Sequence, residues 1–163
     1  MVAMQTTAGI AQFAEIFVMA FMLSWALKKY GMRKTLAIGV IAWPIRYIIF
    51  AIGSPTWLVI ASLTLHGFCY VFFFVAAFIY VDKVAPPDIR ASAQSLIAII
   101  ALGLGRFLGS LFAGGVRDFF TTADGVTNWT NVFLVPCALT IFCAVAFLLF
   151  FREESAPAEQ AAA

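Results

Sequence analysis

The sequence predicts an all-α membrane protein, a polytopic bundle of five transmembrane helices. Hydrophobic residues make up 64% of its 163 residues and charged residues only 11%, whereas a soluble domain has roughly 45–50% apolar and about 25% charged residues. The apolar residues are gathered into long runs. A helix needs about 20 such residues to cross roughly 30 Å of hydrocarbon.

Charged residues, glycine and proline divide these runs. Lys28-Lys29 ends the first run, Gly53-Ser54-Pro55 the second and Asp82-Lys83 the third. The fourth begins after Pro86-Pro87-Asp88, and the fifth ends at Arg152. We therefore expect a membrane domain over residues 1–154, with helices at about 7–27, 35–53, 56–82, 88–116 and 129–151. The Ala-rich tail 155–163 is expected to be disordered.

Lysine and arginine are distributed unequally between the two sides of this bundle. Only Arg117 lies on one side. Seven lie on the other: Lys28, Lys29, Arg33, Lys34, Lys83, Arg90 and Arg152. Because cytoplasmic loops carry the excess of positive charge, the first and third loops and the C-terminus are expected in the cytoplasm. With five spans the N-terminus would then lie outside, and the protein would be a multi-pass protein of the cytoplasmic (inner) membrane.

Four ionisable residues interrupt the apolar runs: Glu15, Arg46, His66 and Arg106. A charge near the bilayer centre costs about 2.5–3.5 kcal/mol even on the lenient insertion scale. Such residues therefore usually face the bundle interior, where they bind substrate, relay protons or pair with one another. This pattern is typical of a transporter.

The depths of these residues predict a buried charge network formed by Glu15, Arg46 and Arg106. At about 1.5 Å per helical residue, Glu15 and Arg46 lie roughly 20 and 18 Å from the cytoplasmic side. His66 and Arg106 lie roughly 24 Å from the same side. We expect Glu15 and Arg46 to form an ion pair or to share one polar cavity. The alternatives are a purely structural pair and, for His66, a packing role rather than a proton relay.

Polar and aromatic side chains on two of the helices suggest a ligand site. His66, Tyr70 and Phe74 recur every four residues and share one helix face. Such a stripe can stack on a flat ligand and bond to its edge, although aromatic packing between helices would give the same pattern. Gln12 and Glu15 lie three residues apart on the first helix. An amide beside a carboxylate suits a polar uncharged ligand.

Several other function classes receive no support. The net charge of +2 is too small to suggest a nucleic-acid partner. The sequence has no Walker motif and no nucleophile–base pattern, so we predict neither an enzyme nor a cofactor. The spacing of Cys69, Cys137 and Cys143 fits neither a metal site nor a disulfide framework.

Several segments resemble the nucleoside:proton symporters of the major facilitator superfamily. They are Leu65–Val75 (LHGFCYVFFFV), Ile79–Lys83 (IYVDK) and Ile89–Gln94 (IRASAQ), together with Ala14–Phe17 (AEIF) and the loop Lys29–Lys34. The resemblance covers about residues 9–153 and the last five of the family's twelve spans. It implies a partial major facilitator fold that lacks the N-terminal half of the transporter.

The resemblance also implies roles for individual residues. It implies that Gln12 and Glu15 contact the nucleoside and that His66 and Tyr70 line the same cavity. The family pattern reads Tyr-Asp-Phe where this chain has Val71. That aspartate is the natural candidate for proton coupling, and valine cannot carry a proton. Either Glu15 or His66 has taken over this role, or transport proceeds without protons, or the substrate differs.

The sequence therefore predicts a secondary active transporter, or a C-terminal fragment of one, that resembles nucleoside:H⁺ symporters. Its expected partners are a small-molecule solute such as a nucleoside, the lipid bilayer and the missing N-terminal half. The alternatives are a transporter of another polar solute, and a non-transporting remnant or accessory membrane subunit.

Overall fold

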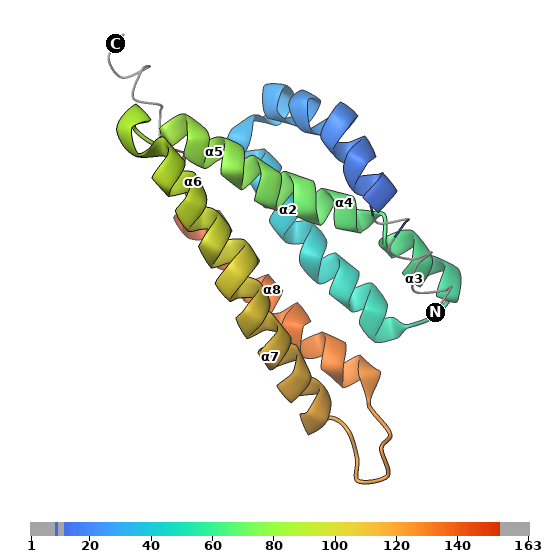
Figure 1. Cartoon of the computed structure of the whole chain (residues 1–163). Helices are drawn as coiled ribbons and strands as arrows, with labels where there is room; N and C mark the ends of the chain where they lie inside the picture. The colour runs from blue at the N-terminus through green and yellow to red at the C-terminus, as the bar shows by residue number, and fades with distance from the viewer. Residues whose placement is uncertain (1–8, 10–11, 154–163) are drawn as a thin grey trace.

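The computed structural model describes residue 9 and residues 12–153, which are almost entirely helical (Figure 1). The helices up to the sharp turn near Pro86 are η1 (Val18–Leu23), α2 (Ser24–Ile52), α3 (Thr56–Ser62), α4 (Leu65–Cys69), η2 (Tyr70–Val75) and α5 (Ala76–Val84). Those that follow are η3 (Pro87–Ile89), α6 (Arg90–Ala98), η4 (Ile99–Leu104), α7 (Gly105–Phe119) and α8 (Trp129–Phe150). The elements η1, η2 and η4 are π-helical, and η3 is a 3₁₀ turn.

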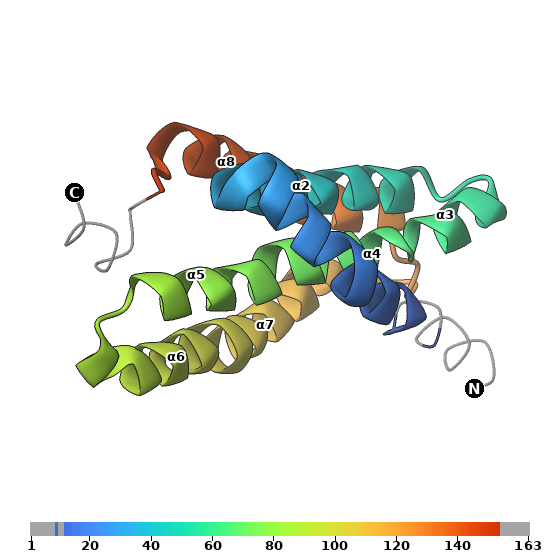
Figure 2. The same ribbon diagram turned by 90° about the horizontal axis from the view of Figure 1, so that it is seen from above.

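The first helical run, Gln12–Ile52, folds back on itself at Gly31. Gly31 has φ 76° and ψ 175°, a conformation that glycine adopts because it has no Cβ. The run therefore consists of a first arm, residues 12–30, and a second arm, residues 32–52. Figures 1 and 2 show the chain reversing between the two arms, and Figure 2 shows the first arm running toward α4.

This arrangement differs from the separate helices predicted at 7–27 and 35–53. The basic residues between them stay in helical conformation, because lysine and arginine are good helix formers and only Gly31 leaves the helical region. The described residues contain four runs long and apolar enough to cross a membrane, not five: Gln12–Ile52, Thr56–Val84, Pro87–Phe119 and Trp129–Phe150. Residues 7, 8, 10 and 11 of the predicted first helix, and the tail 155–163, lie outside the described residues.

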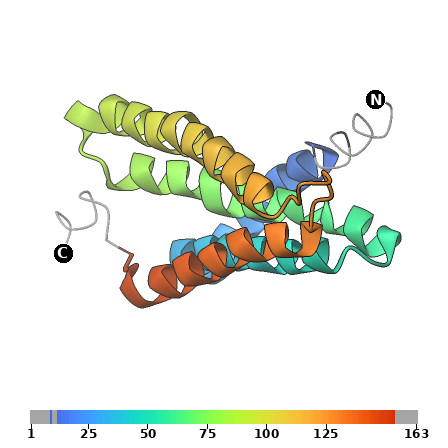
Figure 3. The same cartoon turned by 90° about the horizontal axis from the view of Figure 1, so that it is seen from below.

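The buried core lies where the two arms meet the helix that follows them. It is formed by buried apolar side chains: Val18, Leu23, Ala26, Met32, Leu36, Val71, Phe72 and Ala76. Helix α8 packs along α2, and Phe147 and Phe151 from its end reach the same core. Figure 3 shows α8 beside α2, with α6 and α7 beside α5. In Pro87–Phe119 the most apolar window has no buried residue, so this run lies at the edge of the bundle.

Gly39 allows the second arm to lie directly against η2. A Cβ atom at this position would stand 2.7 Å from the backbone carbon of Phe72 and 2.7 Å from the backbone nitrogen of Phe73. Backbone atoms cannot move aside as a flexible side chain can. The contact therefore requires glycine, and it fixes the distance between α2 and the helix that carries His66 and Tyr70.

Gly39→Ala is expected to destabilise the fold by about 1–3 kcal/mol, the usual cost of overpacking a close contact. Gly109→Ala is the matched control, because its Cβ would meet nothing within 4 Å among the described residues. Alanine is also favoured over glycine in a helix by up to about 1 kcal/mol. Unfolding of both variants in detergent should be followed by circular dichroism. Equal stability of Gly39→Ala and the parent chain would show that the two helices do not meet as described.

Candidate functional site

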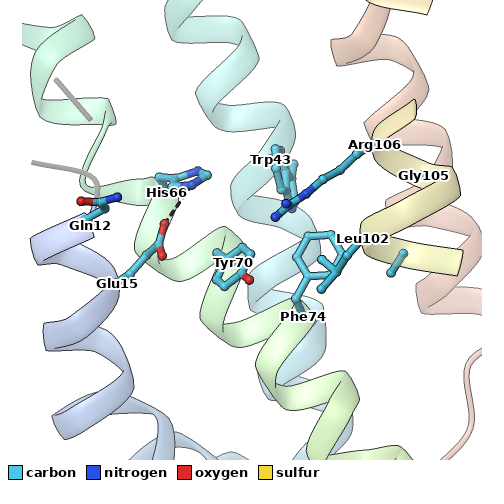
Figure 4. A pocket seen from close by; sticks show the side chains of 10 residues that line it. Gln12, Glu15, Trp43, His66, Tyr70, Phe74, Leu102, Gly105 and Arg106 are labelled. Carbon is cyan, nitrogen blue, oxygen red and sulfur yellow. Dashed lines mark ion pairs between the residues drawn. The ribbon is translucent and has the colours of Figure 1, made fainter. Parts of the chain in front are cut away.

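A cavity of about 620 Å³ opens between the first arm, α2, the α4–η2 segment and the η4–α7 segment (Figure 4). Its walls combine one carboxylate, one amide, one imidazole, one guanidinium and several aromatic rings. The lining residues are Gln12, Glu15, Trp43, His66, Tyr70, Phe74, Ala101, Leu102, Gly105 and Arg106. The residues predicted to bind substrate, Gln12, Glu15, His66 and Tyr70, therefore all line one cavity.

Glu15 reaches His66 because the two helices approach closely beside them. A Cβ atom at Gly67 would lie 2.8 Å from the backbone of Ala14, so only glycine fits at this crossing. Gly67 follows His66 in sequence, and Ala14 precedes Glu15. The resulting polar contact joins Glu15 Oε1 to His66 Nε2 at 3.0 Å, with side chains only 24% and 27% exposed.

Arg46 contacts the opposite edge of the same imidazole. Its Nη1 lies 2.8 Å from His66 Nδ1, and its guanidinium carbon lies 5.0 Å from the centre of the Phe50 ring. Within the described residues, the carboxylate of Glu15 contacts His66 and forms no ion pair with Arg46. The contact expected between Glu15 and Arg46 is therefore made through His66, and Arg46 lies behind the cavity wall.

Arg106 stands apart from this chain of contacts. It lines the cavity from α7, and Figure 4 shows its side chain extending toward Trp43. Among the described residues Arg106 forms no ion pair with Glu15, whose carboxylate contacts His66. A charge network that includes Arg106 stays a prediction. The cavity has a negative group on one side and a positive group on the other.

Aromatic rings connect these polar groups. The centre of the His66 ring lies 6.2 Å from that of Tyr70 and 6.4 Å from that of Trp43, and the Tyr70 and Phe74 rings are 5.5 Å apart. Trp43 was missed from the sequence, although it lies three residues before Arg46 and so on the same helix face. The cavity wall also includes Ala101 and Leu102 of π-helical η4, a helix form that often marks functional sites.

Val71, for which the resemblance implies an aspartate in the family pattern, lies in the core instead of the cavity. Its side chain is fully buried, and it packs with Val18 and Phe72. An ionised carboxylate there would lose its hydration among apolar neighbours. The environment of this residue is therefore suited to valine.

Metal and disulfide chemistry find no support in the described part of the chain. It contains no group of three or more histidine, cysteine or acidic side chains able to hold a metal ion. Its three cysteines are free thiols.

Comparison with known proteins shows the family of this chain. The profile of the family described as "Nucleoside H+ symporter" matches residues 1–156. The chain belongs to the nucleoside H⁺ symporter family. This is a family of membrane transporters of the major facilitator superfamily, so the chain is part of a multi-pass membrane protein and not an enzyme.

Two relatives from Escherichia coli K12 illustrate the similarity. The nucleoside permease NupG is 31% identical over 149 residues, which cover 88% of this chain and 35% of NupG. The xanthosine permease is 30% identical over 154 residues, which cover 91% of this chain and 36% of the permease. The crystal structure of NupG matches with a TM-score of 0.83 at 29% identity, over 91% of this chain and 37% of that one. The chain thus spans about a third of the length of these symporters.

Replacing Arg46 alone is expected to destabilise this symporter segment more than replacing Arg46 and Glu15 together. At about pH 8, above the range in which a free histidine takes up a proton, Arg46→Met leaves the His66–Glu15 pair without its cation, and a mostly buried carboxylate left without compensation costs on the order of 1–3 kcal/mol. Adding Glu15→Gln removes that charge. Unfolding in detergent should compare both variants with Arg117→Met, which breaks only an exposed ion pair with Asp118. Additive losses would show that Glu15 and Arg46 are not coupled through His66.

Proposed function

We propose that this chain forms part of the substrate pathway of a secondary transporter for nucleosides. The observation that supports this most strongly is the cavity itself, in which Gln12, Glu15, His66 and Tyr70 come together from two helical segments. Its volume of about 620 Å³ lies within the range of roughly 300–1,000 Å³ typical of small-molecule sites. The relatives are named nucleoside and xanthosine permeases, which favours a nucleoside over another polar solute.

In this proposal the two chemical parts of a nucleoside meet different walls. The ribose hydroxyl groups donate hydrogen bonds to Glu15, while the amide of Gln12 offers both a donor and an acceptor. The flat base packs on the rings of Tyr70 and Phe74, whose centres are 5.5 Å apart. Arg106, on the other side, offers donors to carbonyl groups on the base.

The proposed transporter needs more chain than these 163 residues. The cavity is lined from one side by the described helices, and the matched relatives are about three times as long. The edge run Pro87–Phe119, which buries no residue of its most apolar window, offers a surface for the remaining helices. We therefore expect the chain to act together with the missing N-terminal half. A non-transporting remnant or accessory subunit remains the alternative.

We further propose that the two arms of Gln12–Ile52 each cross the bilayer once, which gives five spans. A straight run of 41 residues would be about 61 Å long, roughly twice the hydrocarbon thickness, whereas each arm alone is about 30 Å long. Arg33 and the other basic residues near Gly31 would lie in the cytoplasm of the cell, as would the C-terminus. The N-terminus would lie outside the inner membrane.

Reporter fusions provide the test of this topology. A fusion placed after Arg33 is expected to be active only as a cytoplasmic reporter, and one placed after Arg117 only as an external reporter, because positive charge is retained on the cytoplasmic side. A fusion after Arg152 serves as a second cytoplasmic point. An external signal after Arg33, or the same side for Arg33 and Arg117, would contradict the five-span arrangement.

Transport is best measured in a chimera in which this chain replaces the matched segment of E. coli NupG. Vesicles containing the chimera are expected to take up uridine, faster with an inward proton gradient if transport is coupled. Glu15→Gln and Gln12→Leu should each reduce uptake at least tenfold, the effect of about 1.4 kcal/mol, because each loses a hydrogen bond to the ligand. Cys143→Ala, at an exposed site on α8, is the matched control.

Three results would decide between the alternatives. Uptake of neither uridine nor xanthosine by a folded, membrane-inserted chimera would refute the nucleoside assignment. Uptake that ignores the proton gradient would leave a facilitator and exclude a symporter. Robust uptake by the 163-residue chain alone would show that the missing half is unnecessary.

A further inference from the structure

We infer that Arg46 is a positioning residue that fixes His66 as its neutral Nε2–H tautomer. In this state the imidazole donates its one proton to Glu15 and cannot take up a second. The inference decides which group of the cavity can change its charge. It rests on two contacts on opposite edges of one ring, and not on the identity of the transported solute.

The first contact determines the role of Nδ1. A guanidinium group has five N–H donors, no acceptor, and stays protonated in proteins. Arg46 Nη1 lies 2.8 Å from His66 Nδ1, so this hydrogen bond must run from Arg46 to an unprotonated Nδ1. A doubly protonated imidazolium would place a second N–H and a second positive charge against the guanidinium.

The second contact is then determined as well. A neutral imidazole with an unprotonated Nδ1 carries its proton on Nε2. Nε2 lies 3.0 Å from Glu15 Oε1, so it donates to the carboxylate. Arg46 therefore donates a hydrogen bond to His66, and His66 donates one to Glu15. The imidazole links the cation to the carboxylate while it stays neutral.

Among the described residues, the polar contacts of the His66 ring nitrogens are those with Arg46 and Glu15. The rings of Tyr70 and Trp43 lie beside the imidazole, at 6.2 and 6.4 Å between centres. The other titratable or charged groups near this cluster are Tyr47 and Cys69 beside Arg46, and Arg106 on the far side of the cavity. Within the described residues, Arg46 Nε is buried without a hydrogen-bond partner, so the guanidinium bonds through Nη1 to His66.

This arrangement assigns proton uptake in the cavity to Glu15. Arg46 does not lose its proton, His66 does not gain one, and Val71 has none to exchange. A proton that accompanies the solute would add to a Glu15 carboxylate oxygen to give the carboxylic acid, and would leave from the same oxygen on the other side. This last step rests on the proposed function, whereas the tautomer does not.

The tautomer can be read directly, because His66 is the only histidine of the chain. The chain labelled with ¹⁵N-histidine should be reconstituted in nanodiscs and examined by NMR. Long-range couplings from the ring hydrogens distinguish Nδ1 from Nε2. We expect a protonated Nε2 and an unprotonated Nδ1, unchanged as the pH is lowered from about 8 to about 5, the range in which a free histidine titrates. A protonated Nδ1 at any pH in this range would overturn the inference.

Three variants separate the effect of Arg46 from that of the fold. Arg46→Leu should allow His66 to take up a second proton within this pH range, because the guanidinium no longer occupies Nδ1 and the Glu15 carboxylate stabilises an imidazolium. Arg46→Lys, which keeps a cationic donor, should restore the neutral Nε2–H tautomer. Arg106→Leu removes the other cation of the cavity and should leave the spectrum unchanged. A His66 that does not titrate in Arg46→Leu would contradict the role of Arg46.

Glu15→Gln keeps the inference testable should Arg46→Leu fail to fold. With Arg46 in place, His66 should stay neutral in Glu15→Gln, and a titrating ring there would count against the assignment. In the NupG chimera, Arg46→Leu should add a second titration to the pH profile of uridine uptake, which Arg46→Lys should lack. Absence of transport would refute the proposed function, while the NMR result would still decide the tautomer.

Discussion

The site depends on one constraint: ionisable side chains placed within apolar helices must find polar partners inside the protein. Hydrocarbon provides no hydrogen bonds, and an unpaired charge there is costly. His66 meets this requirement for two residues at once, with Glu15 at 3.0 Å on one edge and Arg46 at 2.8 Å on the other. A single imidazole thus links the first arm, the second arm and α4 in one layer of the bundle.

This polar link is possible only because the backbones are close. Gly67 lets the first arm lie against α4, and Gly39 lets the second arm lie against η2. A methyl group at either position would push the helices apart by more than a hydrogen bond tolerates. Packing and electrostatics are therefore coupled here, since the same crossing that buries the apolar core sets the distances around His66.

The arrangement also gives the departure from the family pattern a physical meaning. Val71 is fully buried in the core, one residue after Tyr70, whose ring lines the cavity. A helix turns by about 100° per residue, so neighbouring residues face different surroundings. The position for which the resemblance implies an acid thus lies in an apolar environment here, and the acidic group among the described residues that line the cavity is Glu15.

The amino-acid sequence by itself determined the helical membrane class, because composition and the 20-residue length of a span are local properties. The cost of a buried charge likewise drew attention to Glu15 and His66 before the helix crossings were known. Helix-face spacing added Gln12 and Tyr70, and all four residues line the cavity, although their role in binding stays a prediction.

Only the tertiary structure decided how these residues meet. The matched depths of Glu15 and Arg46 predicted an ion pair or a shared polar cavity and could not decide between them, because depth gives position along the membrane normal but not rotation about each helix axis. The crossings at Gly39 and Gly67 set that rotation, and they place His66 between the two charges with Trp43 in the cavity wall. The sequence likewise did not show that the chain reverses at Gly31. The basic residues around it favour a continuous helix, and only the backbone angles of Gly31 interrupt that helix.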